Sequence, residues 1–493
     1  MSFFDSAAQS DTTPTTAIAT HIYLGKGESE QQLLLKYANR HGLIAGATGT
    51  GKTLTLQGLA EGFSAAGVPV FVADVKGDLS GLCQPGVAKD PLVKRAAEIG
   101  YDYHYFACPT QFWDVFGAQG LPVRVSISEM GPMLLAQLLQ LNDVQAGVLN
   151  IAFAVADTEG LLLLDFDDLR AVLTYVSDNS KDISARYGNV AASSIGAIQR
   201  ALLGLEQQGA KQFFAEPSLE IMDLIATDSR GMGVVNIFSA EKLMQSPKIY
   251  ASFMLWMLAE LFEDMPEAGD MDKPKLVFFF DEAHLLFNDA PKMLVEKIEQ
   301  LVRLIRSKGV GVYFITQNPA DIPASVLGQL SNRVQHALRA FTPQDQKGVK
   351  AAADTFRPNP AFKTADVITT LGVGEALVSV LDDKGSPTIT QRVLIKPPSS
   401  LVGPAAASTR QQIVASSLLH PKYGTTVNRE SAYEYLSRRT ESRQQTTQTT
   451  RNSVRREPEG LAMALTKSVV RAAGSQIGRQ IVRGLLSSML KGR

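Results

Sequence analysis

The chain has 493 residues, of which 45% are hydrophobic and 20% are charged, and its formal net charge is −1. This composition excludes a disordered or fibrous chain. Because the net charge is close to zero, the overall electrostatic field of the protein does not attract nucleic acid. Any contact with nucleic acid must therefore use a local basic patch or a central channel.

The cysteine content and the apolar windows indicate a cytoplasmic protein. Cys83 and Cys108 are too few for a disulfide framework and lack metal-ligand spacing, which is typical of a reducing compartment. The start has no secretory signal pattern, and no apolar window approaches the ~20 residues of a membrane span. We therefore predict a cytoplasmic location.

The first 128 residues predict an arm followed by the start of an α/β core. Residues 1–40 are predicted to be a polar N-terminal arm with a short lead-in. From His41, short apolar runs alternate with helical stretches, which is typical of a parallel sheet with crossover helices. A strand over "HGLIAG", a helix that Gly67 closes and a strand over "VPVFVAD" come first, and "YHYFAC" and "PVRVSI" predict further strands. Residues 41–128 thus form the predicted first part of the core.

The loop "GATGTGKT" at residues 46–53 predicts a nucleotide site. It fits G-x-x-x-x-G-K-[ST] between a predicted strand and a predicted helix. Its glycines let backbone N–H groups point at phosphate oxygens, and the helix N-terminus adds partial positive charge. Lys52 would contact the β- and γ-phosphates, and Thr53 would offer a hydroxyl to Mg²⁺. ATP and Mg²⁺ are the expected cofactors, and an ordinary glycine-rich turn is the alternative. The expected binding residues are Gly46, Thr48, Gly49, Thr50, Gly51, Lys52, Thr53 and Leu54.

Residues 129–217 predict a helical insertion, and the core resumes over 218–396. The insertion lacks β-branched runs and carries three amphipathic stretches. It can be a lid or packing layer, or it can recognise a partner. After it, strands and helices alternate again, including a helix from Pro247 and strands over "KLVFFFDE" and "VGVYFITQNP".

The strand "KLVFFFDE" ends in two acids that predict hydrolysis. We expect them to face the phosphate loop from an adjacent strand, where Asp281 holds Mg²⁺ and Glu282 polarises the attacking water. Away from such a loop, an acidic pair after a strand is usually a helix cap. Asp74, Lys76 and Asp78 follow another strand, where they can orient Glu282, line a central path or form a solvated turn.

Further catalytic candidates are an amide and several arginines. Gln317 ends the next strand, where it can contact the γ-phosphate or the water, although polar residues often end strands without a function. Ring-forming NTPases often complete the site with an arginine from the neighbouring subunit. Arg306, Arg333 and Arg339 are candidates, and each can equally serve in a surface salt bridge.

The C-terminal part predicts a linker and a basic helix. "PPSSLVGP" predicts the end of regular structure, so residues 397–460 are expected to be a linker that is partly disordered. Residues 461–493 carry six basic and no acidic side chains on an apolar helical pattern. A basic amphipathic helix of this kind can lie on anionic lipid, on nucleic acid, in a partner's groove or on its own core.

Five segments together resemble the HerA-like branch of the HerA/FtsK superfamily of P-loop ATPases, most closely the bacterial YjgR-type proteins. In order they are "NRHGLIAGATGTGKT", "VFVADVKGDLSG", "FFFDEAHLLF", "RSKGVGVYFITQNPADIP" and "LSNRVQHALRAFTP". The resemblance covers about residues 20–396 and implies a RecA-like core in a hexameric ring with DNA threaded through its centre. It also implies Lys52 and Thr53 as the Walker A pair, Asp281 and Glu282 as the Walker B pair, Gln317 as the sensor and Arg306 or Arg333 as a trans arginine.

We therefore expect an α/β fold: a RecA-like P-loop NTPase core with a mainly parallel sheet, a helical insertion and a C-terminal basic helical tail. The expected function is Mg²⁺-dependent ATP hydrolysis by a DNA helicase or translocase motor. The alternative is an ATPase of a membrane-docked or protein-handling machine without a DNA substrate. Expected partners are copies of the same chain, DNA, and a membrane or protein contact through residues 461–493.

Overall fold

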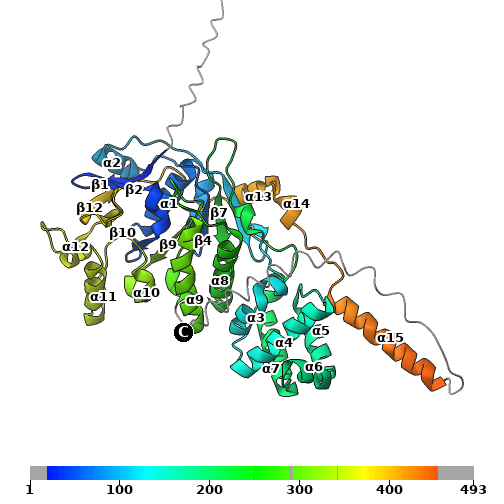
Figure 1. Cartoon of the computed structure of the whole chain (residues 1–493). Helices are drawn as coiled ribbons and strands as arrows, with labels where there is room; N and C mark the ends of the chain where they lie inside the picture. Colours follow the sequence, from blue (N-terminus) through cyan, green and yellow to red (C-terminus); the bar gives the residue numbers. More distant parts are fainter. Residues whose placement is uncertain (1–18, 246, 288–291, 341, 453–493) are drawn as a thin grey trace, which may run out of the picture.

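The computed structural model describes residues 19–245, 247–287, 292–340 and 342–452. Their strands form one sheet with the order β2-β1-β12-β11-β10-β3-β9-β8-β4-β7-β5-β6 (Figure 1). Neighbours from β10 to β6 run parallel, whereas the pairs from β2 to β10 are antiparallel. The strands are β1 (His21–Lys26), β2 (Glu30–Leu34), β3 (Gly42–Ala45), β4 (Val70–Asp74), β5 (Thr110–Asp114), β6 (Leu121–Pro122), β7 (Val235–Ser239), β8 (Leu276–Phe280), β9 (Val310–Thr316), β10 (Asn332–Gln335), β11 (Glu375–Ser379) and β12 (Gln391–Ile395).

Helices cover both faces of the parallel part of this sheet. The helices are α1 (Lys52–Ala65), α2 (Asp90–Ile99), α3 (Ile127–Leu138), α4 (Asp143–Glu159), α5 (Phe166–Asp178), α6 (Ser180–Tyr187), α7 (Ala192–Gln207), α8 (Pro247–Asp264), α9 (Lys292–Leu304), α10 (Ala324–Leu327), α11 (Pro343–Asp354), α12 (Thr364–Thr370), α13 (Ala407–Ser416), α14 (His420–Tyr423) and α15 (Ala432–Asn452). Every residue of β8 is buried. Phe278 and Phe280 pack on the side of α8 and α9, and Val277 and Phe279 on the side of α1. This alternation on a sheet covered twice explains the uninterrupted apolar run and confirms the predicted RecA-like α/β core.

A β-hairpin at residues 21–34 extends the sheet beyond the predicted core. β1 pairs antiparallel with β12, so that Gly25 lies opposite Ile395. A Cβ at Gly25 would lie 2.1 Å from the Leu394 carbonyl oxygen, and its φ is 153°, so the close approach requires glycine here. The lead-in prediction missed this hairpin. Its two strands are neighbours in the chain, but the strand that joins it to the sheet is about 370 residues away.

The two strands predicted over "YHYFAC" and "PVRVSI" are largely wrong. The structure has no strand between Tyr101 and Pro109, and β6 spans only Leu121–Pro122. The alternating tyrosines resemble a strand pattern, yet this segment bonds to loops: the Tyr103 hydroxyl donates to the Pro398 carbonyl, and the Phe106 N–H donates to the Ser399 carbonyl. The rings of Tyr103 and Tyr105 contact each other at a tilt of 59°, with their centroids 4.8 Å apart.

Helices α3 to α7 form the predicted helical segment, which gathers to one side of the sheet next to α8 (Figure 1). Capping boxes start three of them: Ser126 with Glu129, Asn142 with Gln145, and Asp165 with Asp168. Each box pairs two N–H groups that the helix itself leaves unbonded. Its helical character is therefore confirmed, and its boundaries at residues 129 and 217 stay a prediction.

The prediction that regular structure ends after Pro397 is wrong. Helices α13, α14 and α15 follow within the described residues. The first turns of α15 bury Ala432 and Leu436 in the core, and α15 packs along α5. These two buried side chains hold the helix in place, and the rest of it is polar. The sequence therefore shows no apolar periodicity that would predict it.

Asp168 on α5 joins the helical segment to α15. Its side chain is fully buried and accepts N–H groups from Leu164, Asp165 and Tyr433. We expect Asp168→Ala to lower the free energy of unfolding in urea by about 1–3 kcal/mol, because the mutation leaves buried donors unpaired. The matched change Asp178→Ala, at an exposed position of the same helix, should stay within about 0.5 kcal/mol. Equal effects of the two substitutions would contradict this assignment.

Two predicted segments lie outside the described residues: the arm at residues 1–18, and the basic helix at 461–493. Among the helices that the structure does describe, none has both the length and the apolar character needed to cross a bilayer.

Candidate nucleotide and hydrolysis site

Three glycines shape the loop between β3 and α1. Gly46, Gly49 and Gly51 have φ angles of 152°, 78° and 116°. A Cβ at Gly46 would lie 2.5 Å from the Cβ of His336, so a larger residue would push the loop outward. Gly51 precedes α1 without a capping side chain. The first N–H groups of α1 are therefore not bonded to a cap and suit an anion.

Lys52 lies inside this loop. Its side-chain Nζ donates to the Gly46 carbonyl at 2.6 Å and to the Ala47 carbonyl at 3.1 Å. The residue is 7% exposed, and this burial lowers the pKa of Lys52, whereas the charges of Glu282 and Asp281 act to raise it. The Lys52 ammonium is thus hydrogen-bonded to the loop carbonyls and is also attracted by the negative charges of Glu282 and Asp281.

The acids do not stand on the strand next to the loop, so that expectation is wrong. Asp281 and Glu282 follow β8, and β9 lies between β3 and β8 in the sheet. Parallel strands are about 4.8 Å apart, so one intervening strand separates the loop strand from the acid strand by about 10 Å. That spacing leaves room for a phosphate group between the loop and the carboxylates, with the end of β9 between them.

Gln317, at the end of the intervening strand, connects the loop to Glu282. The Thr48 hydroxyl donates to the Gln317 Oε1 at 3.3 Å. The Gln317 Nε2 in turn donates to both carboxylate oxygens of Glu282, each at 3.3 Å. The structure thereby brings together a loop residue, the predicted sensor and the predicted base in one hydrogen-bonded chain.

Glu282 is held as a buried carboxylate. It is 3% exposed and has a left-handed backbone, with φ of 49°. Burial acts to raise the pKa of Glu282, but the ion pair with Lys76 and the bond from Gln317 outweigh it and lower the pKa. The His284 Nδ1 lies 3.3 Å from the Glu282 Oε2 without the alignment of a hydrogen bond. Of the three readings of the turn after β4, the structure therefore favours orientation of Glu282 by Lys76.

The two buried aspartates beside Glu282 differ in their surroundings. Asp74 accepts the N–H groups of Lys76, Gly77 and Leu79 and so shapes the turn that presents Lys76. Burial raises the pKa of Asp74 to about 6. Burial and the Glu282 charge raise the pKa of Asp281 to about 7.

Asp281 offers the carboxylate chemistry that a divalent cation needs, although among the described residues no three Asp, Glu, His or Cys side chains form a metal-binding group. Asp281 accepts an N–H from Glu282. The charges of Glu282 and Asp74 act on it together with the ammonium of Lys76, and its own charge acts on Lys52. Hard oxygen ligands of this kind are those that Mg²⁺ prefers. Asp281, together with the Thr53 hydroxyl at the start of α1, would hold the ion.

His336 behind the loop was missed by the sequence patterns. It is fully buried, with the Nε2 2.8 Å from the Thr55 hydroxyl and the Nδ1 2.8 Å from the Glu375 carbonyl. Burial lowers the pKa of His336 to about 4, so a neutral ring ties α1 to β11. The signal lay in "RVQHALRAF", but a lone histidine after a short strand has no spacing partner that identifies a role.

Two of the predicted trans arginines, Arg306 and Arg333, lie away from the loop of their own chain. Arg306 lies in a short helix (Ile305–Lys308) that precedes β9, at the strand end opposite Gln317. Arg333 uses its guanidinium on the carbonyls of Leu327, Leu330 and Thr355. Arg339 is exposed just after Ala337, whose carbonyl accepts the Ala47 N–H of the loop. A role in a neighbouring subunit stays a prediction for each arginine.

The Lys76 to Glu282 contact predicts a pH effect. Without Lys76, the pKa of Glu282 should be higher than in the wild type, because burial still acts to raise it and the ion pair no longer lowers it. Since the base acts as a carboxylate, Lys76→Met should move the acid limb of the ATP turnover profile to higher pH. Lys94→Met, at an exposed position of α2, is the matched control. An acid limb that is the same in wild type and Lys76→Met would show that Lys76 does not set the ionisation of the base.

Comparison with known proteins places these features among helicase-related chains. Residues 20–461 match the family model described as "Helicase HerA-like C-terminal". The "DNA double-strand break repair helicase HerA" of Sulfolobus acidocaldarius is 25% identical over 171 residues, which are 34% of this chain and 33% of the relative. The "Probable helicase MJ1565" of Methanocaldococcus jannaschii is 31% identical over 110 residues, 22% of this chain and 20% of the relative. The chain thus spans a third or less of the curated relatives it matches.

A solved structure supports the same architecture. The bacterial conjugative coupling protein TrwBdeltaN70, in an unbound form, aligns with a TM-score of 0.51 at 12% sequence identity. The alignment covers 80% of this chain and 92% of that chain. At this identity the likeness shows the shared fold alone.

Proposed function

Because the chain belongs to the helicase HerA-like C-terminal family, we propose that it is a Mg²⁺-dependent ATPase that moves along or remodels DNA as a homo-oligomer. The family and the P-loop ATPase fold are established by the match and the sheet order. ATP turnover, the DNA substrate and assembly are the proposal.

The observation that carries the ATPase proposal is the chain of contacts from Thr48 through Gln317 to Glu282. In this proposal, loop amides and Lys52 bind the β- and γ-phosphates. Gln317 and Glu282 orient a water, which attacks the γ-phosphorus as Glu282 takes its proton and the bond to the bridging oxygen of ADP breaks. Thr53 and Asp281 would hold Mg²⁺, which would neutralise charge on the phosphates.

Support for the DNA and assembly parts is indirect. Both curated relatives are described as helicases, and one of them as a DNA repair protein. Neither Arg306 nor Arg333 approaches the loop within one chain. A neighbouring copy that supplies an arginine to the γ-phosphate would complete the site.

A turnover assay tests the proposed function. The full chain should release phosphate from ATP only with Mg²⁺, and single- or double-stranded DNA at low salt should raise the rate severalfold. Sedimentation should show a larger assembly with ATP than without it. If neither single-stranded nor double-stranded DNA changed the rate of ATP turnover, the DNA part of the proposal would be rejected and the ATPase part would stand. If no ATP turnover occurred under any of these conditions, both parts would be rejected.

A further inference from the structure

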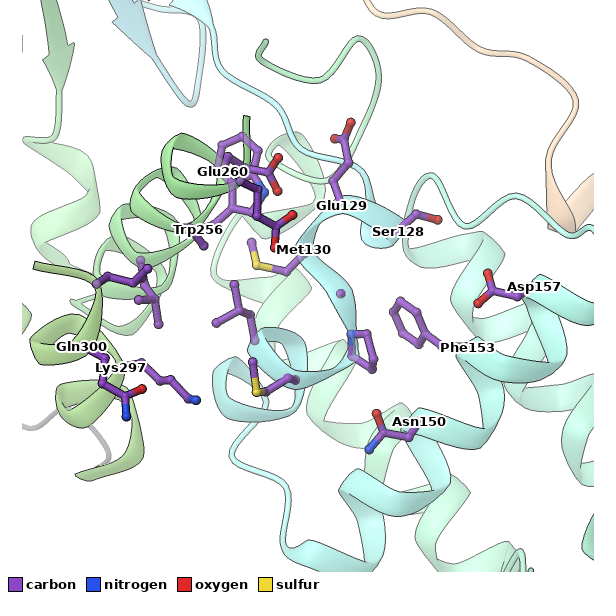
Figure 2. A pocket seen from close by; sticks show the side chains of 18 of the residues that line it. Ser128, Glu129, Met130, Asn150, Phe153, Asp157, Trp256, Glu260, Lys297 and Gln300 are labelled. Carbon is purple, nitrogen blue, oxygen red and sulfur yellow. The ribbon is translucent and has the colours of Figure 1, made fainter. Parts of the chain in front are cut away.

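A groove of about 430 Å³ separates the helical segment from the core helices α8 and α9. Figure 2 shows Trp256 and Glu260 of α8 with Lys297 and Gln300 of α9 on one side. Phe153 and Asp157 of α4 lie on the other side. α9 is the helix between the strand that ends at the two acids and the strand that ends at Gln317, so the groove borders the elements that carry the site.

A break in α3 exposes apolar side chains inside this groove. Gly131, with φ of 71° and ψ of 161°, interrupts the helix just before Pro132. The chain therefore turns between Met130 and Met133, and both line the groove. Met133 is 40% exposed. Methionines adapt to irregular apolar partners, so this surface suits aliphatic side chains rather than one rigid ligand.

Two buried polar atoms at the groove have no hydrogen-bond partner in the structure. They are the Nε1 of Trp256, a residue that is 1% exposed, and the Oε1 of Gln300. Both residues line the groove. A buried donor without a partner is costly. Neither atom is open to solvent, so the side chains that cover them would have to move before an occupant's carbonyl oxygen could accept from Trp256 or its N–H could donate to Gln300. A peptide chain offers both groups.

The charge of the groove indicates which peptide. Carboxylates outnumber ammonium groups along its lining, with Glu129, Asp157, Glu260 and Glu263 against Lys297. Residues 461–493 of this chain have the opposite character: aliphatic side chains with six basic and no acidic residues. We propose that this basic C-terminal segment binds in the groove, with aliphatic side chains on the Met130 to Met133 turn and Lys or Arg side chains at the carboxylates.

The chain beyond Asn452, the last residue of α15, is long enough to reach the groove. The Arg439 Nη1 of α15 lies 3.5 Å from the Glu159 Oε2 at the end of α4, two residues beyond Asp157. To reach the groove, the chain after Asn452 must return along α15 to Arg439, a distance of about 20 Å, and then pass across one helix, which adds about 10–12 Å. Twenty-five extended residues from Asn452 to Ile477 can span about 85 Å. The middle of the basic segment therefore has ample length to enter the groove.

Photocross-linking in the full chain tests this proposal. A benzophenone amino acid at position 133 should give cross-links to residues 461–493 of the same chain, mapped by mass spectrometry on a mixture of isotopically heavy and light chains. The same probe at position 144, which is exposed on α4 and does not line the groove, should give at least tenfold fewer. Arg479→Glu with Arg483→Glu should reduce the yield from position 133 severalfold, and Arg479→Lys with Arg483→Lys should keep it.

Three outcomes would overturn the proposal. In the first, the yield from position 133 is no higher than that from position 144. In the second, about half of the cross-links from an equal mixture join a heavy to a light chain, the share expected when every link forms between two copies, which would place a second copy's segment in the groove. In the third, position 133 gives no link to residues 461–493 while the full chain sediments with phosphatidylglycerol vesicles through that segment, which would place it on membrane lipid. None of these readouts depends on ATP turnover.

Discussion

Lys52→Ala is expected to lower ATP turnover by a factor on the order of 10² or more and to weaken ATP binding. In the structure the ammonium bonds to the loop's own carbonyls and stands in the field of Glu282 and Asp281. When nucleotide binds, we expect the Lys52 Nζ to exchange these carbonyls for β- and γ-phosphate oxygens, which form stronger charge-assisted bonds. Loss of one preorganised group that stabilises transition-state charge typically costs about 10²–10³ in rate.

Phosphate release and titration calorimetry with ATP and Mg²⁺ measure these two effects. Lys94→Ala, at an exposed position of α2, removes the same charge from the surface and should change neither turnover nor affinity. Circular dichroism should show that both variants stay folded. A folded Lys52→Ala protein with wild-type affinity and turnover would remove the basis for the phosphate site.

Glu282→Gln is expected to separate binding from hydrolysis. The amide keeps the shape of the side chain but cannot take a proton from the attacking water, so turnover should fall by about 10²–10⁴-fold. ATP affinity should stay near the wild-type value because Glu282 contacts Gln317 and Lys76 rather than the loop amides. The same two assays apply.

Glu30→Gln, at an exposed position of β2, is the matched control for the carboxyl-to-amide change. It should leave both turnover and affinity unchanged. If Glu282→Gln hydrolysed ATP at the wild-type rate, another group would have to act as the base, and the Thr48 to Glu282 contact chain would have only a structural role.

The parts of the fold and site that the sequence predicts are those coded by neighbouring residues. The loop at residues 46–53 carries its glycines, its lysine and the start of α1 in one run, so its conformation follows from local rules. The apolar run of β8 directly precedes Asp281 and Glu282, and both therefore lie at a strand end as expected. The helices α3 to α5 likewise have local capping boxes.

The parts that the sequence could not predict depend on pairing between distant segments. The position of β9 between β3 and β8 is a choice of strand order, which no local pattern records. The hairpin at residues 21–34 needs β12 as its partner, and α15 needs the buried surface of α5. In the site, the ion pair of Lys76 with Glu282 joins residues 206 positions apart, so the spacing of Asp74, Lys76 and Asp78 alone left three roles open.

The most direct test of this account is an experimental structure of the full chain with Mg²⁺ and a non-hydrolysable ATP analogue. We expect the amides of residues 46–53 to surround the β- and γ-phosphates, the Lys52 Nζ to have moved from the Gly46 carbonyl to phosphate oxygens, and Mg²⁺ to lie between Thr53 and Asp281. A triphosphate bound elsewhere, or Lys52 still on the Gly46 carbonyl beside a bound nucleotide, would contradict the account.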